Sequence, residues 1–330
     1  MSRPLVVVTD FVCEPLDVER SVLADHADLL CAMATNENQL AEVAANAAAL
    51  MVYHEICVTR PTIERLKCCK LIVRCGAGYD NVDAAFARAR GIPVANVPDY
   101  GSEEVADTAI GMLLALTRGI HFLNSRLRDS REPWTYMHTV PLFRLRGRVC
   151  GVVGLGRIGT AAALRAKSLG MDVVFYDPYK PAGYDKALGI RRADSVESLF
   201  RQSHVLTLHC PLTDETRHMV NATSVSWLPL GAFLINTARG AVVDTDLIPN
   251  AIASGQLAGA GIDVLAIEPP RDSDGLFTAW RDSQHPAHHR VILNPHSAFY
   301  SEEGLREMRS KGAQACLDAI SGRPIRNVVN

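Results

Sequence analysis

Short apolar runs alternate with stretches of helical spacing along the whole chain. In the N-terminal part, continuous apolar runs typical of buried strands occur at Leu5–Val8, Leu50–Tyr53, Leu71–Cys75 and Val94–Val97. Between them, apolar residues recur with helical spacing at Leu40–Ala48, Thr62–Lys67 and Val82–Arg90. Strands that alternate with helices in this way predict a small parallel sheet with helices on both faces.

The pattern changes near Pro98, after which a long apolar helix is expected. Ser102 is a suitable N-cap, and Glu103 and Glu104 place acids in the first helical turn. The helix is expected to run to about Leu127, and it is too apolar to be solvated on three sides. We interpret its apolar face as a subunit contact and expect a homodimer, with packing between domains as the alternative.

A second series of strands and helices begins at about residue 148. Its expected strands are Val149–Val153, Val173–Tyr176, Val205–Cys210, Ala232–Thr237, Gly261–Val264 and Val291–Asn294. A last helix, Glu302–Ile320, has no obvious place in this sheet and is expected to return to the first domain. The predicted fold class is therefore α/β, with two doubly wound parallel-sheet domains and a cleft between them.

Composition agrees with two packed domains. The chain has 330 residues, too many for one typical core, and 48% of them are hydrophobic. The formal net charge is −2 without blocks of like charge, which argues against nucleic acid or an anionic membrane as a partner. We see no signal peptide and no apolar run of ~18 residues, and expect a cytoplasmic protein. The nine cysteines lack CxxC spacing and are interpreted as reduced.

A glycine-rich turn follows the strand that ends at Val153. Its three glycines are spaced as in dinucleotide-binding turns. Gly154 allows a tight turn, Gly156 lets a pyrophosphate approach the backbone, and Gly159 lets the helix pack on the strand. The start of the next helix offers N–H groups to the phosphates. Asp177, which ends the next strand, can accept hydrogen bonds from ribose hydroxyls and would repel a 2′-phosphate. The pattern predicts an NAD site; a glycine-rich turn in another kind of α/β domain is the alternative.

Three further motifs follow the last three strands of the second series, and they contain Arg239, Glu268 and His296. Arginine can grip a carboxylate with two parallel hydrogen bonds, and histidine can exchange a proton near neutral pH. A carboxylate beside the histidine would favour the imidazolium and orient the ring. This set suits the reduction of a 2-keto acid, although each residue alone could be an ordinary surface residue or strand terminus.

These motifs resemble those of the D-isomer-specific 2-hydroxyacid dehydrogenases. The resemblance covers nearly the whole chain, including the glycine-rich turn with Asp177 and the runs Asn236–Gly240, Asp263–Pro269 and Pro295-His296. Within the family, the chain is most similar to the C-terminal-binding-protein branch, on Arg74 and on the runs Phe175–Tyr179, Thr207–Cys210 and His296–Glu302.

The resemblance implies a Rossmann NAD-binding domain at residues 100–297 and a flavodoxin-like substrate-binding domain at residues 1–99, to which residues 298–330 return. It implies that Arg239, Glu268 and His296 form the catalytic set. The implied cofactor contacts are Gly154, Gly156, Arg157, Ile158, Gly159, Asp177, Thr237 and Asp263. The implied substrate pocket consists of Tyr53, Arg74, Gly76, Ala77, Gly78, Phe299 and Met308, with Arg74 as a second cation.

Three positions depart from the family pattern. Phe299 stands where the branch often has tryptophan, which implies a roomier pocket. Ala77 replaces a serine and removes one possible contact to the cofactor. Pro249 falls inside an expected helix, and because proline lacks an N–H it should kink that helix or delay its start.

The segment from Pro270 to His289 is expected to be a long loop. It contains three histidines, His285, His288 and His289. Their closeness suggests a metal site, but no cysteine or cluster of acids joins them in the sequence. We therefore interpret the segment as a solvated loop and predict no metal ligand.

Two functions fit this sequence. The first is an enzyme, an NAD-dependent D-2-hydroxyacid dehydrogenase that acts on a small 2-keto or 2-hydroxy acid. The second is an NAD-sensing scaffold that binds short peptides, which the resemblance to the C-terminal-binding-protein branch implies. The chain ends near Asn330 without a tail or added domain and contains no basic cluster, and we expect the enzyme on those grounds.

Overall fold

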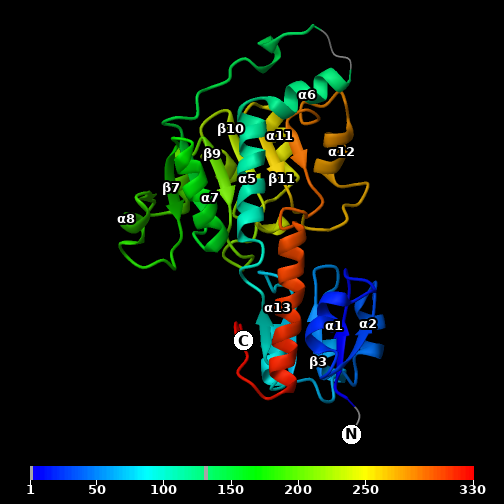
Figure 1. Cartoon of the computed structure of the whole chain (residues 1–330). Coiled ribbons are helices and arrows are strands. Elements are labelled where there is room, and N and C mark those ends of the chain that lie inside the picture. Colours follow the sequence, from blue (N-terminus) through cyan, green and yellow to red (C-terminus); the bar gives the residue numbers. More distant parts are fainter. Residues whose placement is uncertain (1–2, 130–132) are drawn as a thin grey trace. The chain divides into compact units, whose positions relative to one another are not determined.

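The computed structural model describes residues 3–129 and 133–330, and the chain divides into two compact units (Figure 1). The first unit combines Met1–Gly101 with Tyr300–Asn330, and the second unit is Ser102–Phe299. The expected boundaries after residues 99 and 297 each lie two residues before those of the units.

The first unit contains a five-stranded parallel sheet. Its strands are β1 (Leu5–Val8), β2 (Asp28–Cys31), β3 (Ala49–Val52), β4 (Leu71–Arg74) and β5 (Val94–Asn96), in the spatial order β2-β1-β3-β4-β5. The helices that follow the first four strands are α1 (Asp17–Leu23), α2 (Glu37–Val43), α3 (Arg60–Arg65) and α4 (Ala84–Ala89). This strand order is that of flavodoxin-like sheets, so the expected fold class is confirmed here.

Apolar side chains on both faces of the sheet hold the first unit together. On one face, Leu40, Leu50, Ile63 and Ile72 are inaccessible to solvent and belong to one cluster. Full burial of each such side chain contributes about 1.5–3 kcal/mol. Two helices that pack together, α1 and α13 (Glu302–Ile320), complete the unit, and α13 also contacts β3 and β4.

The second unit contains a seven-stranded parallel sheet. Its strands are β6 (Val149–Val153), β7 (Asp172–Tyr176), β8 (Arg191–Arg192), β9 (Val205–Leu208), β10 (Ala232–Asn236), β11 (Leu257–Ile262) and β12 (Val291–Leu293). Their spatial order, β12-β11-β10-β9-β6-β7-β8, reverses direction at β6. That reversal is the switch point of a Rossmann sheet, where ligands bind at the carboxyl ends of the strands.

Helices cover both faces of this second sheet. The longer ones are α5 (Ser102–Thr117), α6 (Ile120–Arg128), α7 (Arg157–Ser168), α9 (Val196–Gln202), α11 (Leu247–Ala253) and α12 (Gly275–Arg281), with α8 (Tyr184–Leu188), α10 (Ala222–Val225), η1 (Tyr136–Thr139) and η2 (Gly240–Val242) between them. One apolar cluster joins α5 and α7 to the sheet, and another joins α9, α11 and α12 to it.

The long helix expected from Ser102 to Leu127 is two helices, so that prediction was wrong. Gly119 separates α5 from α6 with a φ of 64°, a left-handed conformation that glycine adopts without steric cost. The expected effect of Pro249 is confirmed. Pro249 lies in the first turn of α11, where its missing N–H is not needed, and the helix begins only at Leu247.

The segment expected to be a solvated loop, residues 270–289, is partly helical and partly buried, so that interpretation was wrong. It contains α12, and the side chain of His289 is largely inaccessible to solvent. An acid also joins the histidines. Asp129, at the end of α6, lies near both His288 and His289. This contact could not be predicted, because Asp129 is far from the two histidines in the sequence.

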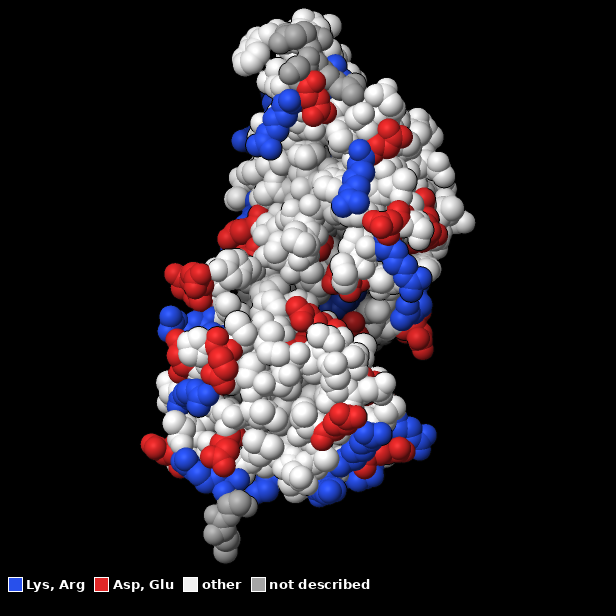
Figure 2. Space-filling view, turned by 90° about the vertical axis from the view of Figure 1, so that its right-hand side faces the viewer, with Lys and Arg blue, Asp and Glu red and all other residues white. Residues whose placement is uncertain are grey.

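Two surface features complete the description. Within residues 3–129 and 133–330, no helix is both long and apolar enough to cross a membrane. On the face drawn in Figure 2, Lys and Arg side chains are interspersed with Asp and Glu. This mixture agrees with the formal net charge of −2.

Candidate active site

The glycine-rich turn connects β6 to α7 and packs against the end of β9. Gly154 has a φ of 83°, and a Cβ there would lie 2.8 Å from the Cα of Cys210. A Cβ on Gly159 would lie 2.0 Å from the carbonyl oxygen of Gly154. Gly156, by contrast, has nothing within 4 Å of a Cβ position. Two glycines therefore permit close packing, and the third leaves open space at the start of α7, whose first residues are Arg157 and Ile158.

Asp177 follows β7 and is tied to this turn. Its carboxylate accepts hydrogen bonds from the backbone N–H groups of Leu155 (2.8 Å) and Tyr179 (3.0 Å). Arg192, which the sequence reasoning did not single out, donates to the carbonyl oxygens of Asp177 (2.7 Å) and Lys180 (2.9 Å). The open backbone at a helix N-terminus, with a carboxylate beside it, fits the pyrophosphate and ribose of a dinucleotide.

A tight turn places Arg239 directly after β10. The buried side chain of Asn236 accepts from the N–H of Ala238 (3.0 Å) and donates to the carbonyl oxygen of Arg239 (3.0 Å). A Cβ on Gly240 would lie 1.9 Å from the carbonyl carbon of Leu265. Only glycine therefore lets this turn touch the segment after β11, and Asn236 holds the turn's shape.

Glu268 and His296 are joined by a hydrogen bond. The Nδ1 atom of His296 lies 2.7 Å from Oε2 of Glu268, and Oε1 of Glu268 accepts from the N–H of Leu265 at 2.7 Å. His296 has a φ of 51°, a strained conformation of a kind that clusters at functional sites. Because Glu268 engages Nδ1, a proton exchanged with a ligand would pass through Nε2.

Asp263 lies at the end of β11 and anchors the segment that carries His296. Its carboxylate accepts from the N–H groups of Ser297 (3.0 Å) and Ala298 (3.1 Å), and its carbonyl oxygen accepts from the N–H of His296 (2.8 Å). Burial raises the pKa of Asp263, and the two N–H groups oppose that change. Phe299 follows in the second unit, with its ring edge-on to His296 at a centroid separation of 6.3 Å.

The other predicted pocket residues belong to the first unit. Arg74 ends β4 and is 6% exposed, and a Cβ on Gly76 would lie 1.5 Å from its Nη1 atom. Gly76 therefore leaves the space that the Arg74 guanidinium occupies. Tyr53 and Met308 are buried, and Ala77 and Gly78 continue the loop after β4. These residues belong to the first unit, whereas Arg239, Glu268 and His296 belong to the second. That they form one substrate pocket stays a prediction.

A partly buried histidine near the glycine-rich turn was not among the expected site residues. His209 follows β9, and its Nε2 lies 2.9 Å from Oγ1 of Thr207. Burial lowers the pKa of His209 to about 4, so the ring is neutral at physiological pH. Thr237 was expected at the cofactor site, and its buried hydroxyl makes no hydrogen bond to any described residue. An orphaned polar atom at a strand end is suited to a ligand contact.

Comparisons with known proteins agree with this arrangement. Residues 110–298 match the family model described as D-isomer specific 2-hydroxyacid dehydrogenase, NAD binding domain. The chain is 31% identical over 327 residues to C-terminal-binding protein 1 of Caenorhabditis elegans. It is 32% identical over 325 residues to D-3-phosphoglycerate dehydrogenase of Methanocaldococcus jannaschii. Each match covers 98% of this chain but only 44% and 60%, respectively, of those curated relatives.

A solved structure is similar over nearly the whole chain. D-lactate dehydrogenase of Aquifex aeolicus, solved in complex with NAD and lactic acid, superposes with a TM-score of 0.84 and is 26% identical. The match covers 96% of this chain and 96% of that one. The similarity in fold therefore extends to both units of this chain.

Proposed function

The chain belongs to the D-isomer-specific 2-hydroxyacid dehydrogenase family, and from that premise we propose that it is an NAD-dependent enzyme that interconverts a 2-keto acid and a D-2-hydroxy acid. The observation that carries this proposal is the Glu268–His296 pair, 2.7 Å apart, next to strand ends that also present Arg239. A histidine oriented by a carboxylate suits proton exchange with a carbonyl oxygen.

NAD is the cofactor, and the residues around the glycine-rich turn suit it. We propose that the N–H groups at the start of α7, beside Gly156, bind the pyrophosphate and that Asp177 binds the adenosine ribose. Thr237, whose hydroxyl is buried without a partner in the described residues, and Asp263 would lie toward the nicotinamide. When bound as NADH, the cofactor supplies the hydride that reduces the substrate's C2 carbon.

The substrate end of the reaction is assigned to three side chains. The Arg239 guanidinium binds the substrate carboxylate, which orients the keto carbon. His296 donates a proton to the carbonyl oxygen during reduction and accepts it during oxidation. Glu268 holds the His296 ring through Nδ1, which leaves Nε2 for the exchange of a proton with the carbonyl oxygen.

Arg74 is proposed to add a second cation for the substrate, and Tyr53, Phe299 and Met308 are proposed as further residues of the substrate pocket. If so, Arg74→Ala should raise the KM for the keto acid more than it weakens NADH binding. Steady-state kinetics and an NADH fluorescence titration on the same variant separate the two effects. An equal loss in both would place Arg74 at the cofactor site instead.

A panel of 2-keto acids with NADH, followed by absorbance at the nicotinamide band, tests the proposed activity. We expect turnover of at least one small 2-keto acid and formation of the D-isomer of the product. Matched reactions with NADPH should be slower, because Asp177 would face the 2′-phosphate. NADH binding without turnover of any member of the panel would contradict the enzyme proposal.

A second candidate function is an NAD-sensing scaffold that binds short peptides. The observation that favours it is the 31% identity to C-terminal-binding protein 1. The same panel separates the two candidates, since a scaffold needs NADH binding but not catalytic turnover.

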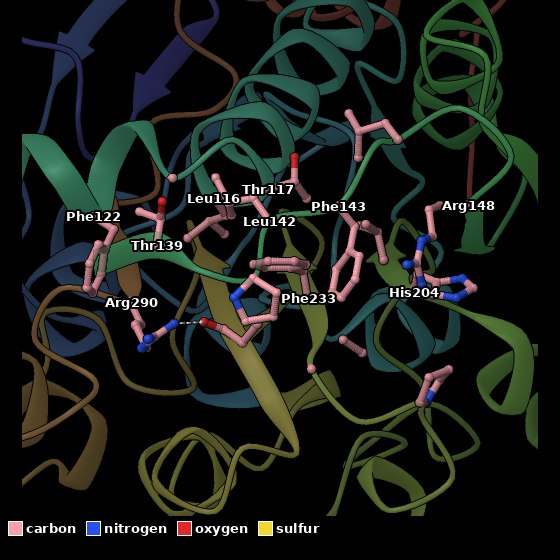
Figure 3. Close-up of a pocket in the computed structure, with 18 of the residues that line it drawn as sticks. Leu116, Thr117, Phe122, Thr139, Leu142, Phe143, Arg148, His204, Phe233 and Arg290 are labelled. Atoms are coloured by element: carbon pink, nitrogen blue, oxygen red, sulfur yellow. Dashed lines mark hydrogen bonds between the residues drawn. The ribbon is translucent and has the colours of Figure 1, made fainter. Parts of the chain in front are cut away.

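We further propose a homodimer formed by the second unit. The segment after α6 exposes large apolar side chains: Trp134 is 82% exposed, Tyr136 71% and Phe143 57%. Next to it lies a hollow whose apolar lining includes Leu116, Phe122, Phe143 and Phe233 (Figure 3). Exposed apolar surface of this kind marks protein contacts.

Light scattering after size-exclusion chromatography should give the mass of a dimer, and Phe143→Glu should shift that mass toward the monomer. A monomeric native protein would contradict the proposed dimer.

A further inference from the structure

One group of metal-ligating side chains lies outside the proposed active site. Asp129 follows α6, and His288 and His289 directly precede β12. One ligand atom from each of the three residues lies within 4.8 Å of the other two. We propose that Asp129, His288 and His289 bind a zinc ion, which would fasten the end of α6 to the segment before β12.

The distances suit a small tetrahedral cation. The Nε2 atoms of His288 and His289 lie 3.4 Å and 3.9 Å from Oδ2 of Asp129. In a tetrahedral zinc site with bonds of about 2.0–2.1 Å, neighbouring ligand atoms are about 3.3–3.4 Å apart. Of the three pairs of ligand atoms, one is therefore at the required separation already and a second needs a shift of about half an ångström. The third pair, the ligand atoms of His288 and His289, lies within 4.8 Å.

Both histidine rings are oriented by a second hydrogen bond. Nδ1 of His288 lies 2.7 Å from the carbonyl oxygen of Trp280. A carbonyl oxygen only accepts, so Nδ1 carries a hydrogen, and Nε2, which lies 3.4 Å from Asp129, is the nitrogen that can bind a metal. Nδ1 of His289 lies 2.8 Å from Oγ of Ser125. Metal-bound histidines characteristically have such a contact on the ring nitrogen opposite the metal.

Burial and ligand type also agree with zinc. The side chain of His289 is 8% exposed and that of Asp129 is 39% exposed. The group is therefore partly buried, and an ion from solvent can reach it. Two imidazoles and one carboxylate are a donor set that zinc accepts, with water as the fourth ligand. The alternative is an ion pair of Asp129 with a protonated histidine, which holds no metal.

Equilibrium dialysis against zinc and a competing chelator, under reducing conditions, tests the proposal. The native protein should retain one equivalent of zinc. Asp129→Asn and His288→Gln should each weaken that binding at least about 10-fold. His285→Gln is the matched control, because His285 is in the same segment but outside the group, and it should bind zinc like the native protein.

Cobalt(II) serves as a spectroscopic probe because the chain also contains nine cysteines. The proposed site should produce ligand-field bands that are absent from Asp129→Asn, without thiolate-to-cobalt charge transfer in the near ultraviolet. Zinc should also raise the Tm of the native protein and of His285→Gln but not that of Asp129→Asn. Thiolate bands with native-like binding in Asp129→Asn, or no retained equivalent at all, would overturn the proposal.

Discussion

Arg239 is the residue whose geometry most restricts its replacement. Asn236 and Gly240 shape the turn that presents it, and its own Nη1 donates to the carbonyl oxygen of Ala238 at 2.8 Å. A planar guanidinium can bind a carboxylate with two parallel hydrogen bonds, and a lysine ammonium cannot.

We therefore expect Arg239→Lys to retain NADH binding but to lose about 10²-fold or more in kcat/KM for the 2-keto acid. Steady-state kinetics with NADH titration measures both. A variant with native kcat/KM would show that a point charge suffices and that the bidentate grip is wrong.

Asp177 is expected to set the choice between the two nicotinamide cofactors. Its carboxylate would face the additional phosphate of NADPH, while Arg192 and Lys180 lie close by along the backbone. Asp177→Ala removes the repulsion and leaves these cations, so the preference for NADH over NADPH should fall by at least about 10-fold. The ratio of the two kcat/KM values is the measurement, and an unchanged ratio would show that Asp177 does not face the ribose.

At the residue scale, the order of strands in the sequence explains which site residues could be predicted to lie close together. Glu268 and His296 each follow a strand of one parallel sheet, and such strands end at the same edge, so the closeness of these two residues could be predicted. Asp129 has no such relation to His288. Asp129 follows a helix that is far from His288 in the sequence, and only the tertiary structure brings the two residues together.

At the scale of elements, α13 is fastened to α1 by a buried ion pair. Arg309 donates to both carboxylate oxygens of Glu19, at 2.8 and 2.7 Å, and Glu19 is fully buried. Removal of one partner from such a pair leaves an uncompensated buried charge, which costs about 3–5 kcal/mol.

Arg309→Met should accordingly lower the free energy of unfolding by about that amount, and the double variant Glu19→Gln/Arg309→Met should recover part of the loss. Denaturant titrations of the native protein, Glu19→Gln, Arg309→Met and the double variant complete the cycle. Additive losses would mean that the two side chains do not stabilise each other.

Strands with a continuous apolar run could be predicted from the sequence better than strands without one. The apolar runs of β1, β6 and β9 are unambiguous, whereas β8 is only Arg191–Arg192 and has no apolar pattern at all. The break at Gly119 could not be placed, because an isolated glycine is tolerated within helices and only the tertiary structure requires its left-handed conformation.

At the scale of the whole molecule, burial of His209 makes stability depend on pH. The pKa of His209 is about 4 in the folded protein and 6.5 in its ordinary state. Between these values the unfolded chain binds a proton that the folded chain does not, so stability rises with pH there. The contribution is fully present above pH 6.5 and is lost as pH falls toward 4, with a size of up to about 3 kcal/mol.

Denaturant titrations of the native protein and His209→Gln from pH 4 to 7 measure this contribution. The variant should lose less stability than the native protein as the pH falls, because glutamine does not titrate. Parallel stability curves would mean that His209 has the same pKa in the folded and the unfolded protein, and would contradict burial as the cause of a shift.

The alternation of strands and helices predicts two parallel sheets, and the structure contains both. The spatial order of the strands does not follow from that alternation, since β6 lies between β7 and β9 through crossovers that no local pattern encodes. The family resemblance supplied what the hydrophobic pattern could not.

The most direct test of the proposed chemistry is the kcat of His296→Ala with the best 2-keto acid of the panel and NADH, measured beside the NADH affinity of the same preparation. The account predicts a kcat lower by about 10²–10⁴-fold with NADH binding unchanged, because the variant loses its proton donor and keeps the glycine-rich turn. A variant that reduces the keto acid at the native rate would contradict the account.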